Sequence, residues 1–132
     1  EFIRLQPSLR KTIVFVTHDF DEAVRLGDRI AIMQNGQILQ IGTAEDLVLK
    51  PANDYVRAFV QDIPREKVVS LRAILEPLST QAEHNEPFEL DQKIGSAAQR
   101  LIASDQAIAV KDAKGVIVGQ VSRQSYSRWL IK

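Results

Sequence analysis

Residues 29–42 read RIAIMQNGQILQIG, two apolar-rich runs on either side of the pair Asn35-Gly36. Both residues of this pair tolerate the positive φ angles of a type I′ turn, whose twist matches that of two antiparallel strands. The stretch therefore predicts a β-hairpin with strands at residues 29–34 and 37–42. It is the clearest local signal in the chain.

The residues before the hairpin predict a strand and a short helix. The run TIVFVT at residues 12–17 is dense in β-branched and apolar side chains, a pattern typical of a strand buried on both faces of a parallel sheet. In DFDEAVRLGD (residues 19–28), acids at the front and a glycine near the end indicate a helix whose first turn the acids cap. The first residues fit the end of an amphipathic helix through Phe2, Ile3, Leu5, Pro7 and Leu9.

Two short helices are expected after the hairpin. Residues 43–60, TAEDLVLKPANDYVRAFV, open with a threonine cap and acids, carry apolar residues at helical spacing, and are interrupted by Pro51. The polar stretch QDIPREK (residues 61–67) reads as a linker. We therefore expect two domains, at residues 1–61 and 62–132.

The second half predicts a β-α-β-β-α unit, so the chain as a whole is of the α/β class. A short strand or extended segment with one helical turn is expected at residues 67–78, and a polar loop, STQAEHNEP, at residues 79–87. Four further elements follow the loop. They are a helix at residues 91–104, two strands at residues 106–112 and 115–122 joined by the turn DAKG, and a closing helix at residues 123–132.

Composition excludes several classes of function. The 132 residues carry 17 basic and 17 acidic side chains, so the total charge predicts no nucleic-acid partner. The absence of cysteine excludes disulfides, thiolate metal sites and a cysteine nucleophile. No run is long and apolar enough to span a bilayer. Because residue 1 is Glu and the sequence opens within a helical pattern, we expect a piece of a longer protein.

The last stretch of the chain is locally basic. Five basic side chains face only Asp112 there: Lys111, Lys114, Arg123, Arg128 and Lys132. Such a cluster is a candidate contact for an anionic membrane surface. A solvated face explains the same charges more simply.

His18 is the first candidate site residue. It follows the predicted strand at the edge where open α/β sheets bind ligands, and a neutral imidazole there can bond to a phosphate oxygen or an attacking water. On spacing alone, a histidine whose ring bonds to the backbone is the better explanation. The sequence contains no G-x-x-x-x-G-K-[ST] phosphate loop, no set of residues at metal-ligand spacing and no G-x-S-x-G elbow. It therefore predicts no self-sufficient catalytic centre.

Gly119, Ser122 and Ser125 form the second candidate site, where the last strand meets the last helix. A hydroxyl and the N–H groups of a helix N-terminus can hold a ribose or a phosphate. Capping of the helix by Ser122 is the simpler explanation. Tyr126 and Trp129 on that helix are expected in the core or in a dimer interface rather than as a platform for base stacking.

Residues 12–60 resemble the C-terminal end of an ABC-transporter ATPase domain in register throughout, from the switch-histidine segment through DEA…L.DRI.IM..G.I.Q.GT to the terminal helices. The resemblance covers residues 1 to about 61. It implies that residues 12–17 are an inner strand of the ATPase sheet. It also implies that His18 contacts the γ-phosphate of ATP and helps to hold the hydrolytic water.

Residues 65–132 resemble a CBS domain, mainly through QAIAVKDAKGVIVGQVSRQSYSRWL. Nucleotide-binding CBS domains follow the pattern G-h-h-[ST]-x-x-D, where h is apolar. Here Gly119 and Ser122 match, but Ser125 stands where the ribose-binding aspartate would be. The resemblance therefore implies weak or absent nucleotide binding. Because CBS units pack in pairs, it also implies a homodimer through this segment.

An importer ATPase followed by CBS sequence is similar to the quaternary-amine group of importers, whose solutes are glycine betaine, proline betaine, carnitine and choline. This similarity implies that the chain is part of a cytoplasmic subunit, peripheral on the inner face of the cell membrane. That subunit would use ATP and Mg²⁺ to energise osmoprotectant uptake with a membrane permease and a solute-binding protein. Alone, the chain is expected to hold neither ATP nor a metal and to be inactive.

Two alternatives remain open at this point. The chain can be a non-catalytic CBS regulatory module that binds an adenine nucleotide or senses ionic strength. Alternatively, the ATPase part is poorly ordered and only the CBS half folds well.

Overall fold

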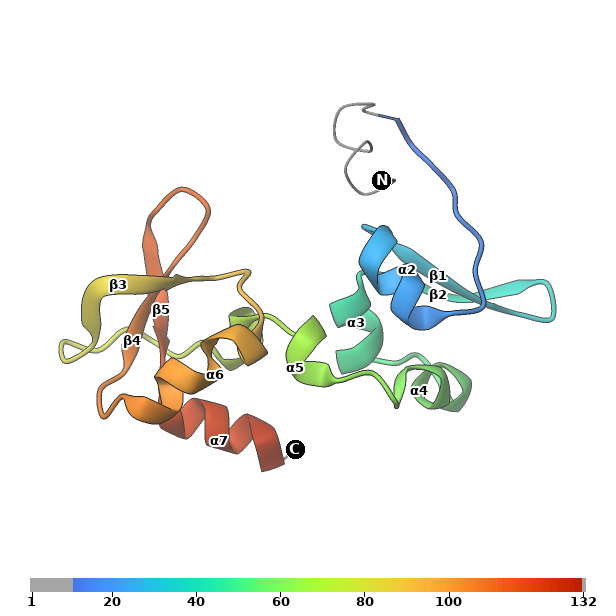
Figure 1. Ribbon diagram of the computed structural model, residues 1–132. Helices are drawn as coiled ribbons and strands as arrows, with labels where there is room; N and C mark the ends of the chain where they lie inside the picture. The colour runs from blue at the N-terminus through green and yellow to red at the C-terminus, as the bar shows by residue number, and fades with distance from the viewer. Residues whose placement is uncertain (1–10, 132) are drawn as a thin grey trace. The chain divides into compact units, whose positions relative to one another are not determined.

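The computed structural model describes residues 11–131, so the helix end predicted at residues 2–9 lies outside the described residues. The chain divides into two compact units, one ending at Ile63 and the other beginning at Pro64 (Figure 1). Both units combine helices with a small sheet. The predicted α/β class is therefore confirmed.

The N-terminal unit contains the short helix, the hairpin and the two helices that the sequence predicts. Their bounds are α2 Phe20–Leu26, β1 Ile30–Gln34, β2 Gln37–Gly42, α3 Ala44–Leu49 and α4 Asp54–Val60. The hairpin is antiparallel, and Gln34 faces Gln37 across the turn. Asn35 and Gly36 adopt φ angles of 52° and 75°, as the predicted type I′ turn requires.

The core of this unit lies between the hairpin and the helices. Its buried residues are Phe20, Ile30, Ile32, Leu47, Val56 and Val60. The ring of Phe20 meets that of Phe59 edge-on, with centroids 5.7 Å apart. α2, β1, α3 and α4 therefore each contribute buried apolar side chains, and Leu39 of β2 packs against them. The helical spacing of apolar residues in the sequence predicted this buried face for α3 and α4.

The predicted strand at residues 12–17 is wrong. These residues form no regular secondary structure, and Val14 and Val16 are each 88% exposed. A strand of the buried parallel type needs a strand on each side of it. Among the described residues, the sheet of this unit holds only β1 and β2, which pair with each other.

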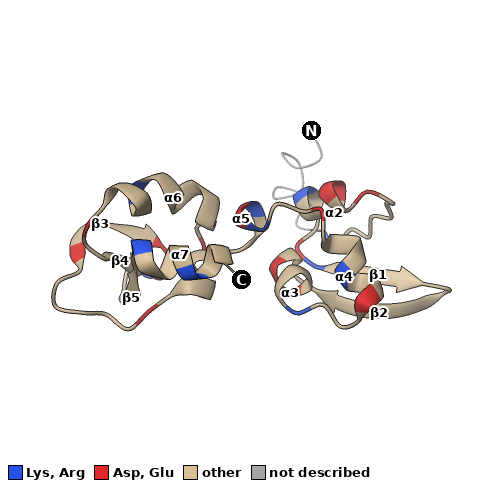
Figure 2. Cartoon of the chain, turned by 90° about the horizontal axis from the view of Figure 1, so that it is seen from below, with Lys and Arg blue, Asp and Glu red and all other residues tan. Residues whose placement is uncertain are grey.

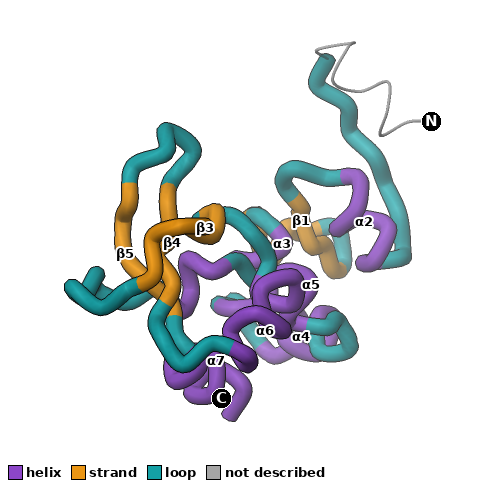
Figure 3. The backbone as a smooth tube through the Cα atoms, turned by 60° about the vertical axis from the view of Figure 1, so that its left-hand side comes forward, coloured by secondary structure: helices purple, strands orange, loops and turns teal. Residues whose placement is uncertain are grey.

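The C-terminal unit contains a three-stranded sheet in the order β3-β4-β5, covered by helices α6 and α7 on one side (Figures 1 and 3). β4 pairs in parallel with β3 and antiparallel with β5. The element bounds are α5 Arg65–Val68, the 3-10 helix η1 Leu71–Ile74, β3 Glu83–Glu89, α6 Ile94–Ala103, β4 Ile108–Lys111, β5 Ile117–Val121 and α7 Arg123–Ile131. The predicted order β-α-β-β-α is therefore present.

The first strand of this unit is not where the sequence placed it. Residues 67–78 form helical turns and isolated bridges, whereas β3 occupies most of the predicted polar loop. Main-chain bonds to the β4 segment explain the difference, since the N–H of Glu83 donates to the carbonyl of Ala107 at 2.7 Å. β3 is an edge strand, which tolerates both its polar residues and Pro87.

Part of the predicted linker is also structured. Residues 65–68 form α5, which packs against α6. The two helices approach closely because Gly95 has no Cβ, which would lie 3.1 Å from the carbonyl oxygen of Glu66. Residues just after the unit boundary are therefore part of the C-terminal unit.

The extended segment Leu75-Glu76 lies against β5. Glu76 and Gln120 exchange two main-chain hydrogen bonds, of 2.8 and 2.9 Å. A Cβ on the adjacent Gly119 would lie 2.6 Å from the carbonyl oxygen of Glu76 and 2.9 Å from Cδ1 of Leu75. Glycine at residue 119 therefore permits this close approach.

None of the helices described is both long and apolar enough to cross a bilayer.

Substitution Gly119→Ala tests the close approach of Leu75-Glu76 to β5. The added methyl group has to displace main-chain atoms, so we expect a loss of about 1–3 kcal/mol in the free energy of unfolding, measured by urea denaturation. Val118→Ala, at an exposed position of the same strand, is the control and should change the free energy by less than about 0.5 kcal/mol. Equal stability of the Gly119→Ala variant and the wild type would contradict the packing.

The capping box of α3 generates a pH prediction. Thr43 Oγ1 accepts from the N–H of Asp46 at 3.1 Å, and Asp46 Oδ2 accepts from the N–H of Thr43 at 3.0 Å. The main-chain bond from Thr43, followed by the bond with its side chain, lowers the pKa of Asp46. The charged form is favoured in the folded state, so its stabilising effect is present above the unfolded pKa and is lost as the pH falls through the folded pKa.

Accordingly, the difference in thermal midpoint between the wild type and Asp46→Asn should be largest near pH 6 and shrink as the pH falls from about 4 to about 2. Asp62→Asn, an exposed substitution, serves as the control and should show no such trend. A midpoint difference for Asp46→Asn that is constant over this range would refute the prediction.

Candidate functional site

His18 lies at a bend directly before α2, and its side chain is exposed. The residues around it are held by hydrogen bonds. The N–H of Asp19 donates to Thr17 Oγ1 at 3.0 Å, and Thr17 Oγ1 donates to Glu22 Oε2 at 2.5 Å. Asp19 caps α2 through a bond of 3.3 Å from the N–H of Glu22, as the sequence predicted. The bend thus presents His18 to solvent from an ordered helix start.

An exposed imidazole in this position can bond to a phosphate oxygen that another part of a protein supplies. The sheet edge that the sequence placed before His18 is not formed by the described residues. The role of His18 in ATP hydrolysis therefore stays a prediction.

The structure brings Ser122 and Ser125 together where β5 meets α7, with Gly119 three residues earlier on the strand. Ser122 Oγ accepts from the N–H of Ser125 at 3.1 Å, and Ser125 Oγ accepts from the N–H of Ser122 at 2.9 Å. Ser125 Oγ also donates to the carbonyl of Ser122 at 2.9 Å. The two serines therefore cap the helix reciprocally, with Ser125 in the place that Glu or Gln usually takes in a capping box.

Glu76 is a residue of this site that the sequence reasoning missed. Its carboxylate accepts from Ser122 Oγ at 3.2 Å and from the guanidinium of Arg128. The side chain of Glu76 is three-quarters buried, whereas that of Arg128 is mostly exposed. Only one signal in the sequence pointed to Glu76, the extended segment predicted before Pro77. The pairing of this segment with β5, which brings Glu76 to Ser122, depends on tertiary structure.

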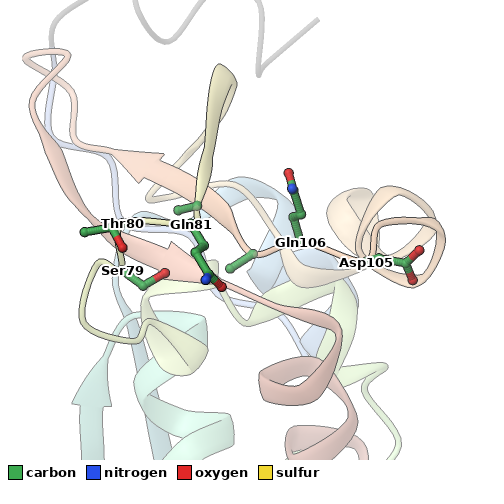
Figure 4. Close-up of a pocket in the computed structure, with 7 residues that line it drawn as sticks. Ser79, Thr80, Gln81, Asp105 and Gln106 are labelled. Atoms are coloured by element: carbon green, nitrogen blue, oxygen red, sulfur yellow. The ribbon is translucent and has the colours of Figure 1, made fainter.

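Two shallow hollows lie beside this junction. The larger, of about 610 Å³, is lined by residues 79–82 and 105–107, and Figure 4 shows Asp105 and Gln106 on one side of it and Ser79, Thr80 and Gln81 on the other. The second, of about 380 Å³, is lined by Ser104, Asp105, Gln106, Ala107, Ser122, Arg123, Gln124 and Ser127. Most of these groups are hydroxyls and amides, which suit hydrogen bonding rather than the binding of an apolar ligand.

The predicted basic stretch is largely neutralised. Three of its cations form ion pairs with acids from elsewhere in the unit, rather than facing only Asp112. These pairs are Lys111 with Glu89, Arg123 with Asp105 and Arg128 with Glu76. Figure 2 shows the basic positions of α7 in blue and acidic positions of the same unit in red. Lys132 lies outside the described residues. The local excess of positive charge is therefore smaller than the sequence indicated.

Within residues 11–131, no three His, Asp or Glu side chains lie close enough to hold a metal ion.

No family model matches the chain. Among curated proteins, the trimethylamine N-oxide transport system ATP-binding protein TmoW of Pelagibacter ubique is 43% identical over 121 residues, which are 92% of this chain and 36% of that protein. The glycine betaine/carnitine/choline transport ATP-binding protein OpuCA of Bacillus subtilis is 37% identical over 123 residues, 92% of this chain and 32% of that protein.

A third relative matches over a shorter stretch. The glycine betaine/proline betaine transport system ATP-binding protein ProV of Escherichia coli is 50% identical over 74 residues, 56% of this chain and 18% of that protein. The chain spans little more than a third of the length of the first relatives. It is therefore a homologue of the C-terminal region of ATP-binding subunits of ABC import systems, the relationship that the sequence resemblance predicted.

Proposed function

We propose that the chain is the C-terminal part of an ATP-binding subunit that energises import of a small osmoprotectant of the glycine betaine, carnitine or choline type. The observation that carries the proposal is similarity along almost the whole chain, through both compact units, to ATP-binding proteins of such transport systems. The solutes that these relatives are named for are small quaternary ammonium compounds or an amine N-oxide. A membrane permease and a solute-binding protein are the partners that this function requires.

In the whole subunit, His18 would contact the γ-phosphate of ATP. Its exposed ring and the hydrogen-bonded bend that carries it support this role. The 132 residues contain no phosphate-binding loop, so other segments would hold ATP and Mg²⁺. The chain alone is therefore expected to be inactive.

The exposed apolar run at residues 12–17 fits the same proposal. Val14 and Val16 are almost fully exposed, and burial of such side chains is worth about 1.5–3 kcal/mol each. In the whole subunit, neighbouring strands of the ATPase sheet would cover this run. The strand-like composition of this run would then become a strand only beside those neighbouring strands, which the described residues do not supply.

We further propose that the C-terminal unit is a CBS-type regulatory and dimerising segment. Its β-α-β-β-α order supports this assignment. Large apolar side chains are exposed on α6 and α7, namely Ile102, Leu130 and Ile131. A second copy of the unit would cover them and remove their apolar surface from water. The subunit would lie in the cytoplasm, on the inner face of the membrane.

Substitution His18→Ala tests the catalytic role. In the full-length subunit that carries this sequence, loss of the γ-phosphate contact should lower the rate of ATP hydrolysis by about 100-fold. His84→Ala removes the other histidine, which is exposed in β3, and should leave the rate unchanged. Equal rates for the two variants would sink the assignment. Steady-state ATP hydrolysis by the 132-residue chain, abolished by His18→Ala, would instead overturn the expectation that the chain alone is inactive.

Substitution Leu130→Asp tests the dimer. Sedimentation of the chain at micromolar concentration should show a dimer, and Leu130→Asp should convert it to monomer because a charge cannot be buried there unpaired. Val116→Asp is a matched control, since Val116 and Leu130 are each 56% exposed but Val116 lies at the β4–β5 turn. A wild-type chain that sediments only as monomer would count against the proposal.

A further inference from the structure

We infer that Glu76, Ser122, Ser125 and Arg128 form a closed network that occupies the β5–α7 junction in place of a nucleotide. The side chains of the C-terminal unit itself then hold α7 against the sheet, and adenine nucleotides do not bind at the junction. It concerns this unit alone and does not depend on the transport function proposed above.

The polar groups that would meet a ligand are already used within the chain. A serine hydroxyl has one donor, and both donors at the junction are committed. Ser122 Oγ donates to Glu76, and Ser125 Oγ donates to the carbonyl of Ser122. The N–H groups of the two serines bond to each other's hydroxyls. A phosphate or a ribose would have to break these bonds before it made its own.

Ser125 is also badly placed for a ribose. Its side chain is short, and the residue is 5% exposed. An aspartate in this position would present two acceptor oxygens to a sugar, whereas Ser125 directs its hydroxyl back to the main chain of the cap. The hydroxyl of Ser125 therefore serves as part of the helix cap rather than as a ligand contact.

Charge at the junction points the same way. The Glu76 carboxylate accepts the hydrogen bond of Ser122 Oγ at 3.2 Å, so a phosphate brought to that hydroxyl would have to displace a negatively charged group that is already there. Among the residues that line the two hollows, all of them in the described part of the chain, Arg123 is the single cation. Its guanidinium already bonds to Asp105 at 2.8 Å and to the carbonyl of Ser104 at 3.0 Å.

The same network has a structural consequence for α7. Glu76 belongs to the segment that pairs with Gln120 of β5. Ser122 caps the start of α7, and Arg128 lies in the second half of that helix. The bonds from Glu76 therefore tie two positions of the helix to the sheet. The carboxylate of Glu76 and the guanidinium of Arg128 are both charged, and hydrogen bonds between two charged groups are stronger than those between neutral groups.

The first arm of the test asks whether the site is closed to nucleotides. The whole chain is titrated with AMP, ADP and ATP in a calorimeter, and no saturable binding is expected. A dissociation constant below about 1 mM for any of the three, abolished by Ser122→Ala, would overturn the inference. Failure in this arm leaves the ATP-hydrolysis test of His18 untouched, so the two proposals can be distinguished.

The second arm asks whether the network holds α7. Glu76→Ala should speed amide hydrogen exchange along α7 by about tenfold. Glu86→Ala, an exposed carboxylate of β3, is the control and should leave the exchange rates unchanged. Should Glu76→Ala fail to fold, Glu76→Gln keeps the bond from Ser122 but loses the ion pair, and should raise the rates near Arg128. Unchanged α7 exchange rates in a folded Glu76 variant would overturn the inference.

Discussion

The pairing of main-chain hydrogen bonds between extended segments is the constraint on which this structure depends. An extended segment becomes a strand only where a partner takes up its N–H and C=O groups. Residues 30–42 supply their own partner through a two-residue turn. β3 finds one in β4, more than twenty residues away, and Glu76 finds one in β5. Residues 12–17 have the most strand-like composition and have no strand beside them among the described residues.

This constraint also shapes the junction of β5 and α7. Because Glu76 pairs with Gln120, its side chain reaches Ser122 and Arg128, and Gly119 is needed to let the two main chains approach. The serines that resemble part of a nucleotide site then act as a helix cap. The polar groups of this junction thus bond to the protein itself.

The proposed function rests on sequence similarity for the type of protein and on local structure for the roles of His18 and the apolar run before it. Similarity to ATP-binding subunits extends through both units and carries the assignment to an import system. The geometry of the chain contributes an exposed His18 on an ordered bend and an exposed apolar run before it, both of which fit a domain completed by further segments. The C-terminal unit has a core and a sheet of its own, so the regulatory and dimerising role proposed for it can be tested separately.

The sequence by itself determined the elements whose causes are local. Asn35-Gly36 specified the turn, Asp19 and Thr43 specified helix starts, and Pro51 separated two helices. It also predicted the α/β class and the proximity of Ser122 to the start of α7. The strands β1, β2, β4 and β5 also lie within the stretches that the sequence predicted. Only the tertiary structure decided that residues 12–17 form no strand, that β3 replaces a predicted loop, and that Glu76 completes the network at the β5–α7 junction. The physical reason is that a strand, unlike a helix or a tight turn, has its hydrogen-bond partners at distant positions in the chain, which composition and spacing do not reveal.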